Sequence, residues 1–199
     1  ETELIGRLNG RKDPEAERMK RYLNMPDLSR TPGSPLEEII NRVKKIPILK
    51  DFDDIKVPEI VSTDILFDLF NMPPSHPARS RSDTYYVDDS HVLRTHDTVM
   101  WYYYLNHPSV QEKIKNNEPL AVICYGKVYR KDEIDRFHMN VFHQMGGLYL
   151  VPDNQKTITT DDLKSVLSDV AKVFLAMLIF VFMTILFLTP TPVLKWKQK

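Results

Sequence analysis

The sequence has a single cysteine, no net charge and no visible secretory signal. Its one cysteine, Cys124, lies in an apolar run, which excludes an internal disulfide and favours a buried small residue over a nucleophile. Basic and acidic residues both number 27, so no overall basic field is available to hold nucleic acid. Residues 1–4 show no basic segment leading into an apolar run, so no secretory signal is visible. A single cysteine fits a reducing compartment. The 199 residues are enough for one domain with its own core.

Two short apolar runs enclose the stretch around which we expect the chain to be organised. Residues 120–125 and 147–151 are rich in β-branched and aromatic residues and are bounded by proline or glycine, as strands are. The mostly charged residues between them predict a solvated loop, and so a long antiparallel hairpin. Arg130 leaves the first strand, and Phe142 and Gln144 enter the second. An arginine fork suits a phosphate or carboxylate, a phenyl ring offers a stacking face, and a glutamine both donates and accepts.

Three ordered blocks of residues carry a resemblance to a known family. The hairpin block, with Tyr-Arg-Lys-Asp at 129–132, His138 and Phe-His-Gln at 142–144, resembles motif 2 of the class II aminoacyl-tRNA synthetases. The upstream blocks at 76–79 (His-Pro-Ala-Arg) and 93–96 (Leu-Arg-Thr-His) agree with it in order and spacing. Within that class the chain is most similar to the catalytic, alpha-subunit type of phenylalanyl-tRNA synthetase.

The resemblance implies a reaction and a set of site residues. Phenylalanine would be activated by ATP to an aminoacyl-adenylate and then transferred to tRNA(Phe), with Mg²⁺ accompanying the triphosphate. Arg130 would be the catalytic residue, stabilising negative charge on the α-phosphate and the substrate carboxylate. No cluster of histidine and cysteine with zinc spacing occurs, so no protein-held metal is expected. The implied ATP-binding residues are Arg130, Asp132, His138 and Phe142, and the implied amino-acid-binding residues are His96, Thr98 and Gln144.

The expected fold is α+β, a mostly antiparallel sheet flanked by helices, in a domain of residues 34–199 that follows a polar arm at 1–33. Ser34, Pro35 and Glu37 have the pattern of a capped helix start, and an extended segment follows at 55–61. This helix and strand resemble motif 1, which implies contact with a synthetase beta subunit or a second copy. An ordinary amphipathic helix and edge strand explain the same residues equally well. The resemblance implies a cytoplasmic protein, with an organelle as the alternative.

Two departures from the family pattern keep a second function open. The family continues its Phe-His-Gln with a glutamate two residues later, near the substrate ammonium, where this sequence has Gly146. The glycine-rich motif 3 is also not present, because no glycine follows Gly147, and half of the usual ATP clamp is lost with it. A catalytically incomplete module that binds an amino acid, a nucleotide or a partner is therefore the alternative.

The last part of the chain allows two structural interpretations. Residues 159–162 (Thr-Thr-Asp-Asp) predict a helix cap, and apolar residues from Leu163 to Phe174 follow a helical period. Residues 173–194 are uncharged, and we expect them to be buried strands that continue the sheet. A bilayer span is the competing interpretation, because about 18–20 apolar residues suffice to cross a membrane. That alternative would make the chain a membrane-tethered scaffold, and the resemblance makes membrane attachment the less favoured option.

Overall fold

The computed structural model describes the backbone of residues 1–188 and the side chains of residues 1–175. It divides into two compact units, one of Glu1–Glu37 and Asp51–Thr157 and one of Glu38–Lys50 and Ile158–Lys199. The strands are β1 (Asp53–Ile55), β2 (Ile60–Ser62), β3 (His91–Leu93), β4 (Leu120–Tyr129) and β5 (Val141–Leu150). The α-helices are α1 (Thr2–Gly10), α2 (Pro14–Leu23), α3 (Pro35–Val43), α4 (Thr63–Leu66), α5 (Met100–Leu105), α6 (Pro108–Lys115) and α7 (Thr160–Leu188). Three short 3₁₀ turns are η1 (Asp68–Phe70), η2 (Pro77–Arg79) and η3 (Asp97–Val99).

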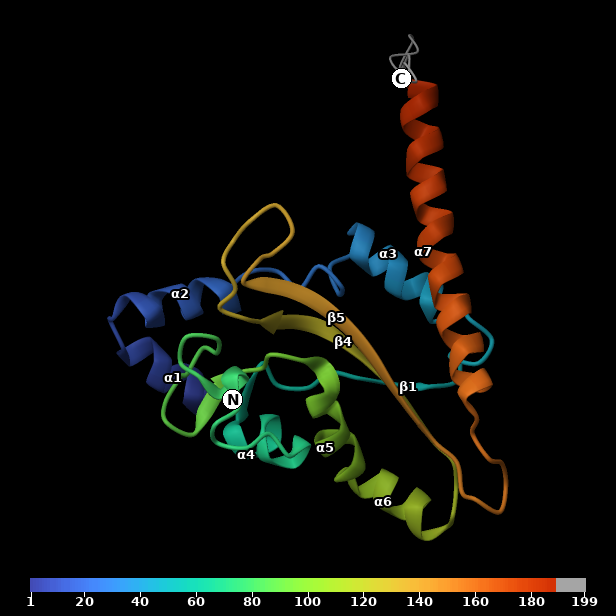
Figure 1. The fold of residues 1–199 in the computed structure, drawn as a ribbon, viewed down its shortest axis with the longest axis horizontal. Helices are drawn as coiled ribbons and strands as arrows, with labels where there is room; N and C mark the ends of the chain where they lie inside the picture. The colour runs from blue at the N-terminus through green and yellow to red at the C-terminus, as the bar shows by residue number, and fades with distance from the viewer. Residues whose placement is uncertain (189–199) are drawn as a thin grey trace. The chain divides into compact units, whose positions relative to one another are not determined.

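The first unit is built on the expected hairpin. Strands β4 and β5 pair antiparallel over ten residues each, from Leu120 opposite Leu150 to Tyr129 opposite Val141. Strand β1 adds to the free edge of β4 in parallel, giving the order β1-β4-β5, and β2 and β3 form a separate antiparallel pair. Figure 1 shows the long β4–β5 ribbon with α5 and α6 following one another beside it. The predicted α+β class, with a mostly antiparallel sheet and flanking helices, is confirmed.

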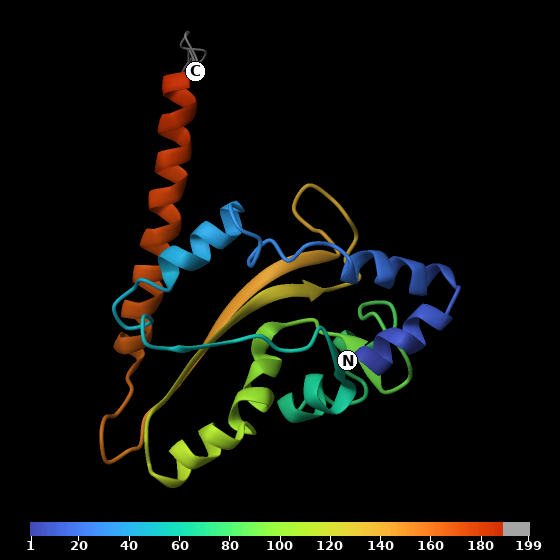
Figure 2. The ribbon, with the colours of Figure 1, turned by 180° about the vertical axis from the view of Figure 1, so that it is seen from behind.

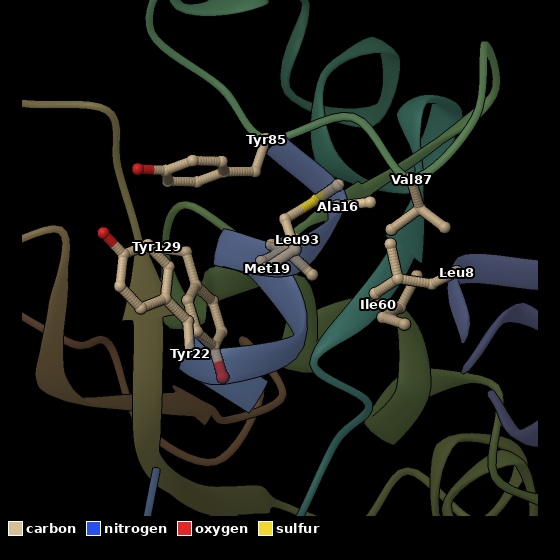
Figure 3. Packing of buried hydrophobic residues seen from close by; sticks show 9 residues of the cluster. All are labelled: Leu8, Ala16, Met19, Tyr22, Ile60, Tyr85, Val87, Leu93 and Tyr129. Atoms are coloured by element: carbon tan, nitrogen blue, oxygen red, sulfur yellow. The ribbon is translucent and has the colours of Figure 1, made fainter. Parts of the chain in front are cut away.

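The N-terminal helices belong to the core of this unit. Asp13 caps α2 by accepting a hydrogen bond from the amide of Ala16 at 3.0 Å, and Pro14 occupies the first turn. Figure 3 shows how side chains from α1 and α2 pack with residues of β2, β3 and β4. The rings of Tyr22 and Tyr85 meet edge to face with their centroids 5.6 Å apart. The cluster comprises Leu8, Ala16, Met19, Tyr22, Ile60, Tyr85, Val87, Leu93 and Tyr129.

This packing corrects the expected division at residue 33. The sequence was expected to begin with a polar arm at 1–33, apart from a domain of residues 34–199. In the structure, residues 1–37 form one compact unit with residues 51–157. The physical reason is that Ala16, Met19 and Tyr22 recur every three residues, so α2 has one apolar face among its charges and buries it.

The second unit contains most of α3 together with α7. Helix α3 starts as predicted, with the Ser34 hydroxyl accepting from the amide of Leu36 at 3.2 Å and Glu37 accepting from the amide of Gly33 at 3.0 Å. Thr159 and Asp162 form the predicted cap of α7, each side chain accepting from the other residue's amide. Figure 2 shows α7 as one unbroken helix.

The expectation of buried strands over residues 173–194 is wrong as far as residue 188, because α7 is helical there. No glycine or proline interrupts residues 160–188, and leucine, alanine and methionine favour a helix, so nothing stops the helix that begins at Thr160. The remaining residues of that expectation, 189–194, lie outside the described residues. Over the described part of the chain, none of the helices combines the length and apolar character that a membrane span requires.

Candidate functional site

A short segment after β3 is fixed against the end of β4. The amide of Tyr129 donates to the carbonyl of Arg94 at 2.9 Å, and the Arg94 Nε donates to the carbonyl of Lys127 at 2.8 Å. Arg94 is 2% exposed, so its guanidinium is part of the interior. Because this segment is tied to the strand at two places, the residues that follow it, His96–Val99, are placed over the sheet with little freedom.

The pair Arg130 and Phe142 stands where the hairpin opens into its loop. Phe142 lies opposite Val128 in the β4–β5 register, and the Arg130 guanidinium lies 5.1 Å from the centre of the Phe142 ring. The Arg130 Nε donates to the carbonyl of Thr95 at 3.1 Å, which leaves the rest of the fork for a ligand. A planar cation and an aromatic face therefore stand together, which are groups that suit a phosphate and a flat ring.

His96 and Thr98 form a pair beside it. The Nδ1 of His96 and the Thr98 hydroxyl are 2.6 Å apart, and the ring of Phe70 meets His96 edge-on with centroids 5.2 Å apart. Burial lowers the pKa of His96; the backbone of Leu66 opposes this, and the positive charge of Arg130 adds to it. The imidazole is therefore neutral at neutral pH. Among the described residues, none forms a hydrogen bond with its buried Nε2.

Gln144 brings β5 into contact with the same segment. Its side-chain oxygen accepts a hydrogen bond from the amide of Asp97 at 3.1 Å. Gln144, Phe142 and Gly146 alternate along β5 and so share one face of the strand. The structure thus gathers five of the predicted residues on one face of the hairpin: His96, Thr98, Arg130, Phe142 and Gln144.

Two predicted ATP-binding residues lie instead in the exposed loop of residues 131–139. The backbone carbonyl of Asp132 accepts a hydrogen bond from the Asn140 side chain at 2.7 Å, and the Asp132 side chain is exposed. The His138 ring is paired with Asp135 at 2.9 Å inside the loop. The loop tip is open, since Phe137 is 74% exposed. The described structure therefore does not bring His138 together with the Arg130 and Phe142 pair.

Asn140 fixes the base of this loop and was not singled out from the sequence. It is buried, donates to the carbonyls of Arg130 and Asp132, and accepts from the Tyr22 hydroxyl at 2.8 Å. The amide of Arg130 in turn donates to the Asn140 carbonyl at 3.0 Å. Arg130 is thus positioned by an asparagine that Tyr22 of α2 also holds. In the sequence an isolated asparagine gives no signal of that role.

Asp97 is the second residue that sequence reasoning missed. Its side chain is 8% exposed, and a Cβ placed on Gly146 would lie 2.2 Å from its Oδ2. Burial raises the pKa of Asp97, while its own amide and the charge of Arg94 act the other way. The signal in the sequence was indirect: a glycine where the family pattern expects a glutamate.

The residues present suit a nucleotide better than a bare metal ion. Arg130 and Phe142 offer a cation and a stacking surface. Within the described part of the chain, no group of three or more histidine, cysteine, aspartate or glutamate side chains is arranged to hold a metal. A magnesium ion at this site would therefore be held mainly by triphosphate oxygens rather than by a cage of protein ligands.

Comparison with known proteins gives one family. Residues 22–181 match the family tRNA synthetases class II core domain (F). The phenylalanine–tRNA ligase alpha subunit of Clostridium perfringens is 35% identical over 168 residues, covering 79% of this chain and 45% of that protein. The alpha subunit of Fusobacterium nucleatum is 36% identical over 138 residues, covering 69% and 37%, and that of Thermotoga neapolitana is 32% identical over 139 residues, covering 69% and 40%.

A solved structure agrees at the level of the fold. A pyrrolysyl tRNA synthetase from Desulfitobacterium hafniense superposes with a TM-score of 0.52 at 19% identity, covering 79% of this chain and 52% of that one. The chain spans less than half the length of the curated relatives it matches.

Proposed function

This chain belongs to the family of class II tRNA synthetase core domains, and we propose that it takes part in the ATP-dependent activation of phenylalanine and its transfer to tRNA(Phe). The substrate is suggested by the relatives named phenylalanine–tRNA ligase alpha subunit. The observation that carries the proposal is the Arg130 guanidinium placed over the Phe142 ring, at the end of a hairpin that also holds Gln144.

In the proposed reaction the phenylalanine carboxylate attacks the α-phosphorus of ATP and pyrophosphate leaves. Negative charge builds on the α-phosphate oxygens, and Arg130 stabilises it without moving a proton. Phe142 would stack against adenine. Asp132 and His138 would approach the triphosphate from the exposed loop of residues 131–139, and the triphosphate would bring its own magnesium ion. The ester with tRNA then forms when a ribose hydroxyl attacks the adenylate and AMP leaves.

His96, Thr98 and Gln144 hold the amino acid in this proposal. The neutral imidazole of His96 suits hydrogen bonding rather than charge repulsion with Arg130. Its Nδ1 is oriented by Thr98 at 2.6 Å, so the ring presents Nε2 in a fixed direction. Thr98 has a hydroxyl where the family has serine, so the donor is retained and a methyl group is added.

The proposed partners follow from the same relatives. Their names describe an alpha subunit, and we infer a beta subunit or a second copy that contacts the motif 1 region, α3 and the strands after it. The place of the reaction would be the cytoplasm or an organelle.

The test is phenylalanine-dependent exchange between ATP and pyrophosphate by the purified chain. Arg130→Ala is expected to reduce exchange by at least 100-fold, since charge stabilisation of this kind contributes about 2.7–4 kcal/mol. Arg7→Ala is the matched control, because Arg7 is an exposed arginine on α1 paired with Glu3. Equal exchange in the Arg130→Ala and Arg7→Ala variants would contradict the assignment of Arg130.

A second candidate is a catalytically incomplete module that binds an amino acid or a nucleotide. The observation that favours it is Gly146, where the family pattern has a carboxylate. Calorimetry separates the two: binding of phenylalanine or ATP without exchange supports the incomplete module. Absence of both binding and exchange would overturn both candidates.

A further inference from the structure

A carboxylate lies against the position where the family pattern has a glutamate, but it comes from a different residue. Asp97 lies on η3, and its Oδ2 is 2.2 Å from the position that a Cβ on Gly146 would take, with its Cγ at 3.0 Å. Any larger residue at 146 would collide with this carboxylate. The glycine and the aspartate therefore fit each other, although 49 positions separate them in the sequence.

The segment that carries this carboxylate also carries two of the residues proposed to hold the amino acid, and it contacts the third. Asp97 stands between His96 and Thr98 in the chain, and its amide is bound by the side-chain oxygen of Gln144 at 3.1 Å. All three neighbours are proposed amino-acid ligands. A ligand held by them would have its charged groups within reach of Asp97.

The carboxylate lacks an adequate partner inside the protein. Asp97 is 8% exposed, and within the described residues its Oδ2 accepts no hydrogen bond. Its own amide and the charge of Arg94 stabilise it in part, but the Nε and Nη1 of Arg94 are directed to the carbonyls of Lys127 and Val57. A buried carboxylate in this state is costly, and a cation that arrives with a ligand would satisfy it.

We propose that Asp97 binds the α-ammonium group of the amino-acid substrate, so that the carboxylate of this subsite comes from η3 instead of from position 146 on β5. The inference rests on the proposed function and adds a residue to it. It also removes one reason to regard the site as incomplete, because the absence of a side chain at Gly146 leaves room for the Asp97 carboxylate.

The test compares two ligands that differ in the ammonium group. Phenylalanine and 3-phenylpropanoate are titrated calorimetrically into the purified chain and its Asp97→Asn and Asp97→Ala variants. Both variants are expected to weaken phenylalanine binding by about 10- to 100-fold, the range for a hydrogen bond between charged groups, and to leave 3-phenylpropanoate within about twofold. Asp89→Asn is the control, because Asp89 is fully exposed and pairs only with Arg81 among the described residues.

A swap of positions provides the second readout. Gly146→Glu alone is expected to abolish phenylalanine binding, since its side chain must displace Asp97. The double variant with Asp97→Ala is expected to bind phenylalanine at least tenfold more tightly than Asp97→Ala alone, because the carboxylate is then supplied from β5. Thermal melting of each variant verifies that it is folded.

The outcomes separate this inference from the proposed function. Phenylalanine binding unchanged in both Asp97 variants, with exchange intact, overturns the inference and leaves the function standing. Equal weakening of both ligands identifies a merely structural residue and also overturns it. An unmodified chain that binds no phenylalanine removes the proposed function, and the role of Asp97 with it.

Discussion

The buried carboxylate of Asp97, whose Oδ2 accepts no hydrogen bond among the described residues, predicts that a conservative substitution stabilises the protein. Asp97→Asn keeps the size of the side chain and removes its charge. An unsatisfied buried polar group costs about 1–3 kcal/mol, and more when it is charged. The asparagine amide is itself imperfectly paired there, so part of that cost remains. We therefore expect the free energy of unfolding to rise by about 1 kcal/mol at pH 7, or about 2–4 °C in Tm for a domain of this size.

The stabilisation expected for Asp97→Asn depends on pH, and urea denaturation at several pH values can measure that dependence. Burial raises the pKa of folded Asp97 above the ordinary value of 3.8 that the unfolded chain has. The folded state consequently holds the proton more tightly, and stability is lost as pH rises from about 3.8 through the higher folded pKa. The gain from Asp97→Asn is thus full above that window and disappears below it. Asp89→Asn, at an exposed position, is expected to change stability by less than about 0.5 kcal/mol.

One result would refute this reasoning. If Asp97→Asn lowers the free energy of unfolding at pH 7 by about 1 kcal/mol or more, the carboxylate is stabilised in the folded protein, with Arg94 as the candidate partner. A stabilised variant that has lost phenylalanine binding would instead show that this site sacrifices stability for ligand binding.

Four further predictions concern the neighbouring residues. Arg130→Lys keeps the charge and loses the fork, so kcat/KM for exchange should fall at least about tenfold, and a value near that of the unmodified chain would contradict bidentate binding. Phe142→Leu should raise the KM for ATP about tenfold in the same assay, because stacking on a base contributes about 1–3 kcal/mol; unchanged KM would exclude stacking. Asn140→Ala should cost about 1–3 kcal/mol of unfolding free energy in urea, since it leaves three hydrogen bonds unmade, and a neutral result would show that the loop base holds without it. The pKa of His96 in the folded protein is lowered from 6.5, so the unfolded chain binds the proton more readily and the free energy of unfolding should fall as pH drops through about 6.5. His96→Gln should make the free energy of unfolding depend less steeply on pH in this range, and an unchanged dependence would place its cause elsewhere.

The hairpin could be predicted because its signals are local. Two apolar runs rich in β-branched and aromatic residues, flanking proline and glycine, and a charged interval between the runs specify strands and loop without knowledge of the rest of the chain. Phe142 and Gln144 came from the matched motif 2, and alternation along β5 places them on one face of the strand. Arg130 and His96 came from the matched motifs, and the structure brings their segments together through Thr95.

What could not be predicted depends on contacts between distant residues or on ambiguous runs. The meeting of Asp97 with Gly146 requires η3 to lie over β5, and no spacing rule reveals that. The run after Lys172 is apolar throughout, and an all-apolar run fits a buried strand and a helix equally well until a neighbour decides. The burial of α2 was hidden by its many charges, although its three buried residues have helical spacing.

The hydrogen bonds of Asn140 fix the base of the loop of residues 131–139 independently of the conformation of its tip. Because Asn140 joins the carbonyls of Arg130 and Asp132 and is held from α2 by Tyr22, the two ends of the loop stay at a fixed separation whatever the tip does. Residues 133–139 can therefore be lengthened, shortened or replaced without shifting the guanidinium of Arg130. Loop grafting from relatives should alter what the tip touches while leaving the geometry at the Phe142 ring as it is.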